Sequence, residues 1–380
     1  MSWLTAEEAL AALGTKPQSL YASVSRGRIR ARPDPTEPRR SQYDRDDVER
    51  LARRAAGRRR AETVAADAIR WGDPVLTSSI STIIDGRPYY RGRDAVALAD
   101  TASLEEVAGL LWRSERAEFI SPHPPGIRAG APLETAFLAI AARAGSDVAA
   151  PEPESKGVAA EASAIVGMLA MALTGEGGGT PLHRRIAAAW RRPEAAGLIR
   201  QALVLLADHE LNPSTFAARI AASTGAPLSA AVLAGLATLV GPSHGGAPRM
   251  VAQLVTETDR RGPAAATGSW SGRQGHLAGF GHPLYPGGDP RAAVLLAGFP
   301  LPPAFARFAA IARELTGEVP NVDFALAALS AAFDLPPDAP LQLFLLARSV
   351  GWLAHAMEQI ATGGQIRPRA NYVGPAPGLS

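Results

Sequence analysis

The sequence predicts an all-α, helical body preceded by a small basic domain. From about residue 61 onward, Ala/Leu-rich stretches of roughly 10 to 18 residues alternate with Gly and Pro, and period-two runs of β-branched residues are scarce. The chain has 380 residues, 47% of them apolar, which is enough for two or three domains. We therefore expect a basic domain at 1–62 and a helical remainder.

Positive charge concentrates at the N-terminus. Residues 1–60 hold 14 basic and 8 acidic side chains, net +6, whereas the whole chain carries only +3. Thr5 and Glu8 form a capping-box pattern that opens a helix, and Gly14 ends it. A second helix is expected over 17–25. Two short helices around a glycine turn predict a helix-turn-helix.

An arginine-rich segment follows these helices. Arginine occupies every second position from 26 to 32, and a charged helix is expected to open at Tyr43 and Asp44 and to end in the arginines at 58–60. The order LTxxEAxxxLG, SLYxxVxRGRIRA, YDRDDVERL resembles excisionase-like and MerR-like winged helix-turn-helix modules. This resemblance implies that DNA binds through residues 1–62. A docking or dimer-supporting appendage is the alternative.

The entry to the helical body has one strand-like segment. Residues 77–84 are rich in Ser, Thr and Ile, and Asp85-Gly86 predicts a turn before 89–92, so a small hairpin is expected. Residues 121–135 and 145–158 are rich in Pro, Gly and charge and predict surface loops.

Composition excludes several chemistries. The chain has no cysteine, which removes disulfides, thiol nucleophiles and thiolate metal sites and is typical of a reducing compartment. The N-terminus has no basic segment followed by an apolar one, and no apolar run reaches about 18 residues. We therefore expect a cytoplasmic protein without membrane contact.

Two short motifs do not support the classes they suggest. The glycine run 175–180 lacks the Lys-Ser/Thr pair of a phosphate loop and follows no strand. His209-Glu210 begins like a zinc-protease motif, but Pro213 occupies the place of the second histidine and would break the helix that this motif requires. No metal site is predicted.

A serine-hydrolase motif needs closer scrutiny. Residues 241–245 fit G-x-S-x-G, and Asp323 and His355 follow in the order of an α/β-hydrolase triad. The motif requires a strand before the serine, whereas residues 228–240 are rich in Ala and Leu and suit a helix. This class is therefore disfavoured.

Four segments place polar groups at turns between helices, where they can converge on one cleft. Pro248 is acceptable in the first turn of a helix, Asp289 and Pro290 suit the N-cap and first helical position, and Asn321 suits a cap. The segments are 207–216, 241–246, 279–291 and 320–324.

Together these segments resemble the citrate synthase family, which includes the 2-methylcitrate synthases. The motifs HELNxSTFAAR, GPxHGG, GFGHPLYxxxDPRA, NVDF and RPRAxYxGP occur in this order, and the resemblance runs from Leu76 to Gly374. It implies an acyltransferase that condenses acetyl-CoA with oxaloacetate and hydrolyses the thioester to give citrate and CoA. Propionyl-CoA and 2-methylcitrate are the alternative within the class. No tightly bound cofactor is expected, because the acyl-CoA is a substrate.

The resemblance also assigns roles. Asp323 matches the family base, His244 the residue that hydrogen-bonds the thioester oxygen, and His282 the residue that polarises the oxaloacetate ketone. Acid and base must act together, because neither alone stabilises an enolate at neutral pH. Oxaloacetate-binding residues correspond to His209, Arg291, Arg348 and Arg367.

Assembly and domain closure are implied in the same way. The family arginine that matches Arg367 reaches into the partner's site, so a homodimer is expected. The large helical domain is expected over 63–246 and 331–380, and the small helical domain over 247–330. Closure of the cleft between them would exclude water from the enolate.

Departures from the family pattern affect CoA binding first. Pro283 and Pro286 occupy places where many relatives have basic residues, the second of them close to CoA phosphate. Arg249, shortly after the second motif, is the candidate for a phosphate contact from another direction.

A DNA-binding metabolite sensor with a citrate synthase-like body is the alternative from another functional class. The remaining histidines match no family site and are expected to be structural: His123, His183, His276 and His355.

Overall fold

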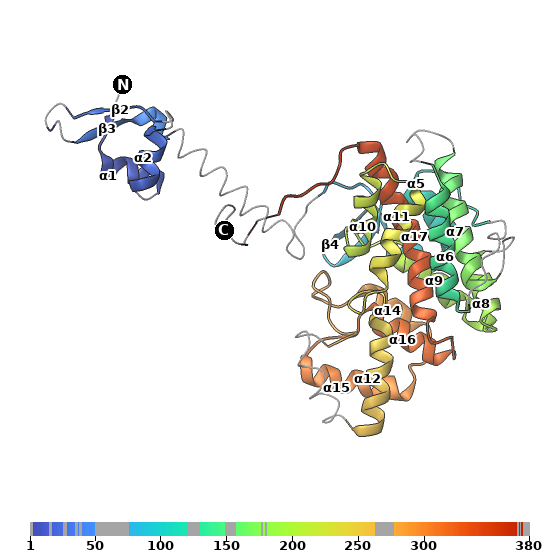
Figure 1. Cartoon of the computed structure of the whole chain (residues 1–380). Coiled ribbons are helices and arrows are strands. Elements are labelled where there is room, and N and C mark those ends of the chain that lie inside the picture. Colours follow the sequence, from blue (N-terminus) through green and yellow to red (C-terminus); the bar gives the residue numbers. More distant parts are fainter. Residues whose placement is uncertain are drawn as a thin grey trace. The chain divides into compact units, whose positions relative to one another are not determined.

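The chain forms two compact units, one made of Met1–Thr77 with Arg367–Ser380 and the other of Ser78–Ile366. A computed structural model describes most of the chain (Figure 1). The described residues are 3–14, 17–25, 29–34, 37, 40–49, 76–120, 130–148, 157–175, 178, 181–262, 277–370, 372 and 374.

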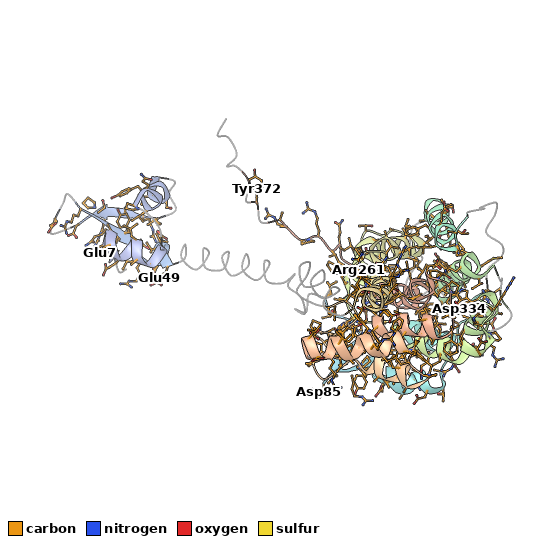
Figure 2. The ribbon with its side chains drawn as sticks, turned by 90° about the horizontal axis from the view of Figure 1, so that it is seen from below. Glu7, Glu49, Asp85, Arg261, Asp334 and Tyr372 are labelled. Carbon is orange, nitrogen blue, oxygen red and sulfur yellow. The ribbon has the colours of Figure 1, made fainter. Side chains whose placement is uncertain are left out.

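The first unit contains the predicted pair of short helices. In α1 (Ala6–Leu13) Thr5 and Glu8 form the predicted capping box, and Gly14 ends the helix with φ of 58°. The second helix is α2 (Pro17–Ser25). Glu7 and Glu49 are exposed on this unit (Figure 2). Seven apolar side chains form its core: Leu4, Ala9, Leu13, Leu20, Ile29, Tyr43 and Val48.

Three short strands complete this unit. They are β1 (Trp3–Leu4), β2 (Ala31–Pro33) and β3 (Ser41–Asp44), and they pair antiparallel in the order β1-β3-β2. Residues 45–49 are helical, so the charged helix expected to open at Tyr43 and Asp44 begins just after these residues, which belong to β3. Its expected end at 58–60, and the arginines at 26 and 28, lie outside the described residues.

The second unit opens with the predicted hairpin. Strands β4 (Ser81–Ile84) and β5 (Arg87–Tyr90) pair antiparallel, and β6 (Arg93–Asp94) extends the sheet. Asp85 and Gly86 have φ of 50° and 71°, as a two-residue turn between right-twisted strands requires. Asp85 lies at the periphery of the body (Figure 2).

After these strands, the described residues of this unit are mainly helical, as predicted. The predicted helix at 228–240 is present, so no strand precedes Gly241. One expectation needs correction: Pro132 occupies the first turn of a helix that runs to Ser146, so the loops predicted at 121–135 and 145–158 are both shorter. The helices are α4 (Ala95–Thr101), α5 (Leu104–Trp112), α6 (Pro132–Ser146), α7 (Val158–Thr174), α8 (Leu182–Ala189), the 3₁₀ turn η1 (Pro193–Ala195), α9 (Ala196–Leu206), α10 (Pro213–Ala222), α11 (Leu228–Leu239), α12 (Ala247–Arg261), α14 (Pro290–Ala297), α15 (Pro303–Thr316), α16 (Val322–Ala332) and α17 (Ala339–Thr362).

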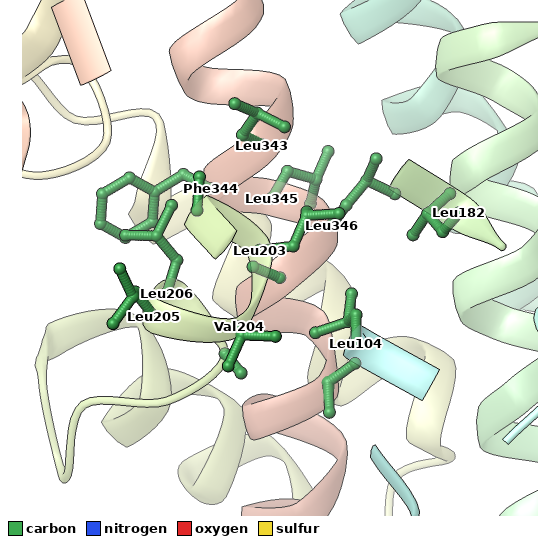
Figure 3. Packing of buried hydrophobic residues seen from close by; sticks show 14 of the residues in the cluster. Leu104, Leu182, Leu203, Val204, Leu205, Leu206, Leu343, Phe344, Leu345 and Leu346 are labelled. Atoms are coloured by element: carbon green, nitrogen blue, oxygen red, sulfur yellow. The ribbon is translucent and has the colours of Figure 1, made fainter. Parts of the chain in front are cut away.

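The core is organised around α17. This helix packs against α5, α7, α9, α10 and α11 and is buried on almost every side. Figure 3 shows residues 203–206 of α9 and residues 343–346 of α17 packed together. Four consecutive apolar residues are buried in each run, as expected for helices that are covered all round. The polar loops at the ends of α9 and α17 are therefore fixed to a rigid centre.

Helices α12, α14, α15 and α16 gather at one end of this unit (Figure 1). An aromatic cluster joins α15 and α16 to the loop before α14: Phe280 lies 5.7 Å from Phe308 and 5.3 Å from Phe324, centroid to centroid. Helices α12, α14 and α15 lie within the predicted small domain at 247–330, and α16 extends beyond it to Ala332. The boundaries 63–246, 331–380 and 247–330 stay a prediction.

Candidate active site

Three histidine loops converge, and each is shaped by a helix end. His209 follows α9, and three residues later Asn212 caps α10 by accepting hydrogen bonds from the amides of Ser214 (3.1 Å) and Thr215 (3.2 Å). Glu210, beside the histidine, has a left-handed φ of 49°. The segment thus lies at a turn between two helices, as the sequence predicted.

His209 and His282 lie side by side, and both contact Tyr285. The two imidazole centroids are 5.2 Å apart, and the Tyr285 hydroxyl lies 2.9 Å from His209 Nε2. Burial, with Arg291 and Arg348 nearby, lowers the pKa of His209 well below its usual value. Tyr285 was present in the third motif, but the sequence assigned it no role.

A backbone contact indicates which ring nitrogen of neutral His282 carries the proton. The amide of Leu284 donates to His282 Nδ1 at 3.2 Å, so in the neutral ring the proton is on Nε2. Burial, with Arg291 adding to it, lowers the pKa of His282 to about 4. At neutral pH His282 is therefore an uncharged imidazole that can donate from Nε2.

His244 is held by a serine that the sequence did not single out. Its Nε2 lies 2.8 Å from Ser214 Oγ, which also accepts from Trp352 Nε1 at 3.1 Å and lies 2.7 Å from Asn212 Oδ1. Burial lowers the pKa of His244 to about 4, with a further contribution from Arg348. Nδ1 has no hydrogen-bond partner among the described residues.

Two buried arginines supply the positive charge. Arg348 donates from Nε to the Leu206 carbonyl at 2.9 Å, and its terminal nitrogens have no partner in the described part of the chain. Arg291 forms a bidentate pair with Asp289, at 2.9 and 2.8 Å. Burial opposes its charge, but the Asp289 carboxylate outweighs that effect and raises the pKa of Arg291.

Asp323 begins α16, where Asn321 caps the helix by accepting from the Asp323 amide at 3.0 Å. Burial raises the pKa of Asp323 to about 7, although Arg291 acts in the opposite direction. A carboxyl with this pKa exchanges a proton readily near neutral pH.

The Asp323 loop is tied to the His282 loop. Asn321 donates from its amide to the Gly279 carbonyl (2.8 Å) and from Nδ2 to the Gly281 carbonyl (3.0 Å). Gly281 has φ of 63°, and a Cβ there would come within 2.6 Å of the Glu318 side chain. The glycines of the third motif therefore permit this close approach.

The structure brings six of the predicted residues together. The charges of Arg291 and Arg348 act on both His209 and Asp323, and His244 and His282 act on His209. The result is a set of neutral imidazoles, one readily protonated carboxyl and two guanidiniums, which suits a small dicarboxylate.

Two predicted residues are not part of this cluster. Arg367 is exposed, in the extended segment after α17, and belongs to the first unit. Arg249 is exposed in the first turn of α12 and lines a groove of about 780 Å³ with residues of α15 and α16. The residues that line this groove include none of the three site histidines. Roles for Arg367 and Arg249 therefore stay predictions.

The other two described histidines lie within helices rather than in the three loops. His355 is fully buried on α17 and packs in the core. His183 is in α8, away from the motifs, and His123 and His276 lie outside the described residues. Among the described residues, no group of three or more His, Asp or Glu could hold a metal ion. No described helix is long and apolar enough to cross a membrane.

Known proteins resemble this chain in sequence and in fold. Residues 131–369 match the family model described as citrate synthase, C-terminal domain. A putative citrate synthase 2 of Mycobacterium tuberculosis is 38% identical over 187 residues, 46% of this chain and 50% of that protein. Citrate synthase 2 of Bacillus subtilis is 29% identical over 362 residues, 80% of this chain and 95% of that one.

A 2-methylcitrate synthase 1 of Corynebacterium glutamicum is 32% identical over 188 residues, 46% of this chain and 49% of that protein. The chain thus spans about half the length of the Mycobacterium and Corynebacterium relatives. A Thermoplasma acidophilum citrate synthase, in a ternary complex with carboxymethyl coenzyme A and oxaloacetate, superposes with a TM-score of 0.66 at 23% identity. The superposition covers 80% of this chain and 95% of that one and shows a common fold.

Proposed function

The chain belongs to the citrate synthase family, and from this premise we propose that it condenses acetyl-CoA with oxaloacetate and hydrolyses the thioester to citrate and CoA. One observation carries the proposal: a carboxyl with a pKa of about 7 shares a cluster with neutral histidines and two buried arginines. Each group that the condensation needs is therefore available in a suitable protonation state.

The first step makes the acyl group nucleophilic. Ionised Asp323 takes a proton from the methyl carbon next to the thioester, while His244 donates from Nδ1 to the thioester oxygen. Ser214 has one hydroxyl proton. Asn212 Oδ1 at 2.7 Å and His244 Nε2 at 2.8 Å can both accept it, and the step requires the hydroxyl orientation that donates to His244, which leaves the imidazole proton on Nδ1. Neutral His244 then stabilises the enolate without a net charge of its own.

The second step forms the carbon–carbon bond. Arg348 and Arg291 pair with the carboxylates of oxaloacetate, and His282 donates from Nε2 to its keto oxygen. The enolate carbon attacks the polarised keto carbon, whose oxygen becomes the hydroxyl of the product. Water then adds to the thioester carbonyl, and CoA leaves as the thiol. His209 adds a further contact to the oxaloacetate.

Propionyl-CoA, with 2-methylcitrate as product, is the alternative substrate. One extra methyl group changes discrimination by only about 1 to 3 kcal/mol, so small differences in the acyl pocket decide it. The Corynebacterium relative is named for that reaction. We propose Arg249, on the exposed first turn of α12, as a CoA phosphate contact in place of the residues absent at Pro283 and Pro286.

We extend the proposal to assembly and location. The family pattern supports a homodimer in which Arg367 enters the partner's site, and closure of the small domain over the large one. The absence of cysteine supports a cytoplasmic location.

Residues 1–62 are proposed to form a winged helix-turn-helix-like module, supported by the order of two short helices and a hairpin. Arg30 pairs with Asp44 and Asp47 at 3.0 and 2.7 Å, and Arg32 lies 4.2 Å from the Trp3 ring. These two arginines are engaged within the module, so DNA binding would depend on others. The comparisons give no support to a DNA-binding sensor, and a sensor would not need Asp323 as a base.

Thiol release tests the proposal directly. Wild-type protein is mixed with oxaloacetate and either acetyl-CoA or propionyl-CoA, and free CoA is measured. Turnover with acetyl-CoA at the higher specificity constant supports citrate synthesis, and a higher constant for propionyl-CoA favours 2-methylcitrate synthesis. Absence of thiol release with both thioesters would refute the condensation.

A further inference from the structure

The residue immediately before His209 in the sequence is a buried carboxylate. Asp208 is 1% exposed, and its Oδ2 accepts from His355 Nε2 at 3.2 Å and from the Ser81 hydroxyl. Burial raises the pKa of this carboxyl, but His355 and Arg348 more than offset that effect, so the pKa is lowered and the group is ionised. None of the steps proposed for the reaction uses Asp208 or His355.

His355 connects this carboxylate to a buried arginine. Its Nδ1 lies 3.4 Å from Arg219 Nη1, and a guanidinium can only donate. Nδ1 therefore accepts, which leaves the imidazole proton on Nε2, the nitrogen that faces Asp208. His355 thus bridges the two charged groups through one donor and one acceptor.

Arg219 carries the connection to the end of α17. Its Nε and Nη2 donate to Gln359 Oε1 at 3.0 and 2.9 Å, and its Nη1 pairs with Glu358 at 2.8 Å. Gln359 Nε2 then donates to the carbonyls of Gly363 and Gly364, the latter at 3.0 Å. Arg367 is three residues beyond Gly364.

The other end of the connection fixes the His209 turn. Ser81 Oγ accepts from the Glu210 amide at 3.0 Å, and Glu210 Oε1 accepts from the Ile83 amide at 2.7 Å. Glu210 has a left-handed φ, a conformation that needs such support. Asp208 and the hairpin therefore hold the backbone on both sides of His209.

We propose that His355 and Arg219 are positioning residues for oxaloacetate, and this rests on the proposed function. The chain of bonds from Asp208 through His355, Arg219 and Gln359 holds two substrate-binding elements in register. One is the turn that carries His209, and the other is the start of the segment that carries Arg367. A displacement of about 1 Å at such groups can reduce turnover on the order of a hundredfold.

Three variants test this positioning. His355→Leu removes both bonds of the imidazole, whereas His355→Gln keeps one donor and one acceptor. Gln359→Glu keeps the acceptor for Arg219 and removes the donor to Gly363 and Gly364. Gln342→Met is the matched control, because Gln342 is a buried amide of the same helix that takes no part in these bonds.

The measurements are KM for each substrate, kcat and the thermal midpoint of the full-length protein. For His355→Leu and Gln359→Glu we expect KM for oxaloacetate to rise on the order of tenfold, the effect of losing one buried hydrogen bond. KM for acetyl-CoA should change less than about twofold, because its binding groups are not in the network. His355→Gln should recover most of the loss, and Gln342→Met should leave both KM values unchanged.

Two results would overturn the proposal. One is a lower thermal midpoint with both KM values unchanged, as for a residue that only stabilises the fold. The other is an equal rise in both KM values. If His355→Leu does not fold, Gln359→Glu and Ser81→Ala, which leave the buried imidazole in place, decide instead and should show the same rise in KM for oxaloacetate. If wild type releases no thiol, the proposed function fails, and the same variants are compared by calorimetric titration with oxaloacetate, where an unchanged Kd rejects the positioning role.

Discussion

At the scale of single residues, Asp323 carries the sharpest expectation. Asp323 is half-buried at the start of α16, and desolvation raises the pKa of its carboxyl to about 7. Asp323→Asn keeps the shape and removes the base, so we expect kcat to fall on the order of 10² to 10⁴-fold. KM for oxaloacetate should change little, because Arg291 and Arg348 remain. Thiol release at saturating substrates measures the loss, and activity close to wild type would mean that another group is the base.

The same carboxyl predicts how stability depends on pH. Because the pKa of Asp323 is about 7 when folded, above its ordinary value of 3.8, the folded state binds more protons between these values. Stability from this group is therefore greatest at low pH and declines as pH rises to about 7.

Asp323→Asn removes this dependence. Its thermal midpoint should match that of wild type near pH 4 and exceed it at pH 8, where wild type must bury a charge. Parallel thermal melts from pH 4 to 8 measure the difference. If the variant were less stable than wild type at pH 8, the ionised Asp323 carboxylate would not destabilise the folded state, which contradicts this prediction.

The sequence indicated which residues belong to the candidate site, but it did not indicate which of their side chains contact one another. His209, His244, His282 and Asp323 could be recognised from their motifs, whereas Ser214 and Tyr285 stood in the same motifs without a role. Ser214 is five positions after His209, and its bond to His244 spans 30 residues. Such pairs depend on tertiary packing, which local spacing does not encode.

At the scale of elements, helix ends were predictable because capping is local. Asp289 and Asn321 cap α14 and α16 as expected, and Asp85-Gly86 forms the hairpin turn. The start of α6 was misplaced because Pro132 is a turn residue that also suits the first turn of a helix.

Asn321 caps α16 and also bonds the Asp323 loop to the His282 loop. Asn321→Ala removes the bond to the Asp323 amide and the Nδ2 bond to Gly281, so we expect stability to fall by about 1 to 3 kcal/mol. Urea unfolding measures this, and kcat should fall as well because Asp323 loses its alignment with His282. Thr316→Ala is the control, since it also removes two side-chain bonds, at the C-terminal end of the preceding helix α15. A stability loss without any change in kcat would show that the side-chain bonds of Asn321 do not align the two loops.

At the scale of the whole molecule, composition and motifs sufficed for the helical class and the family. The basic segment before residue 62 was also recognisable, because its charge of +6 contrasts with the rest. The centre of the body was not predictable: only the structure shows that residues 203–206 and 343–346, far apart in sequence, pack together. Long-range packing of this kind follows from the sum of many weak contacts.

A shared site can be tested by mixing two inactive subunits. If Arg367 enters the partner's site, a dimer of one Asp323→Asn subunit and one Arg367→Ala subunit has one site that contains both native residues. In an equal mixture of exchanging subunits half the dimers are of this kind, so we expect about a quarter of wild-type thiol release. If Arg367 instead serves its own subunit, neither site of the mixed dimer is complete and activity stays at the level of the separate variants. Mixing each variant with more of itself is the control, and size-exclusion chromatography checks that dimers form.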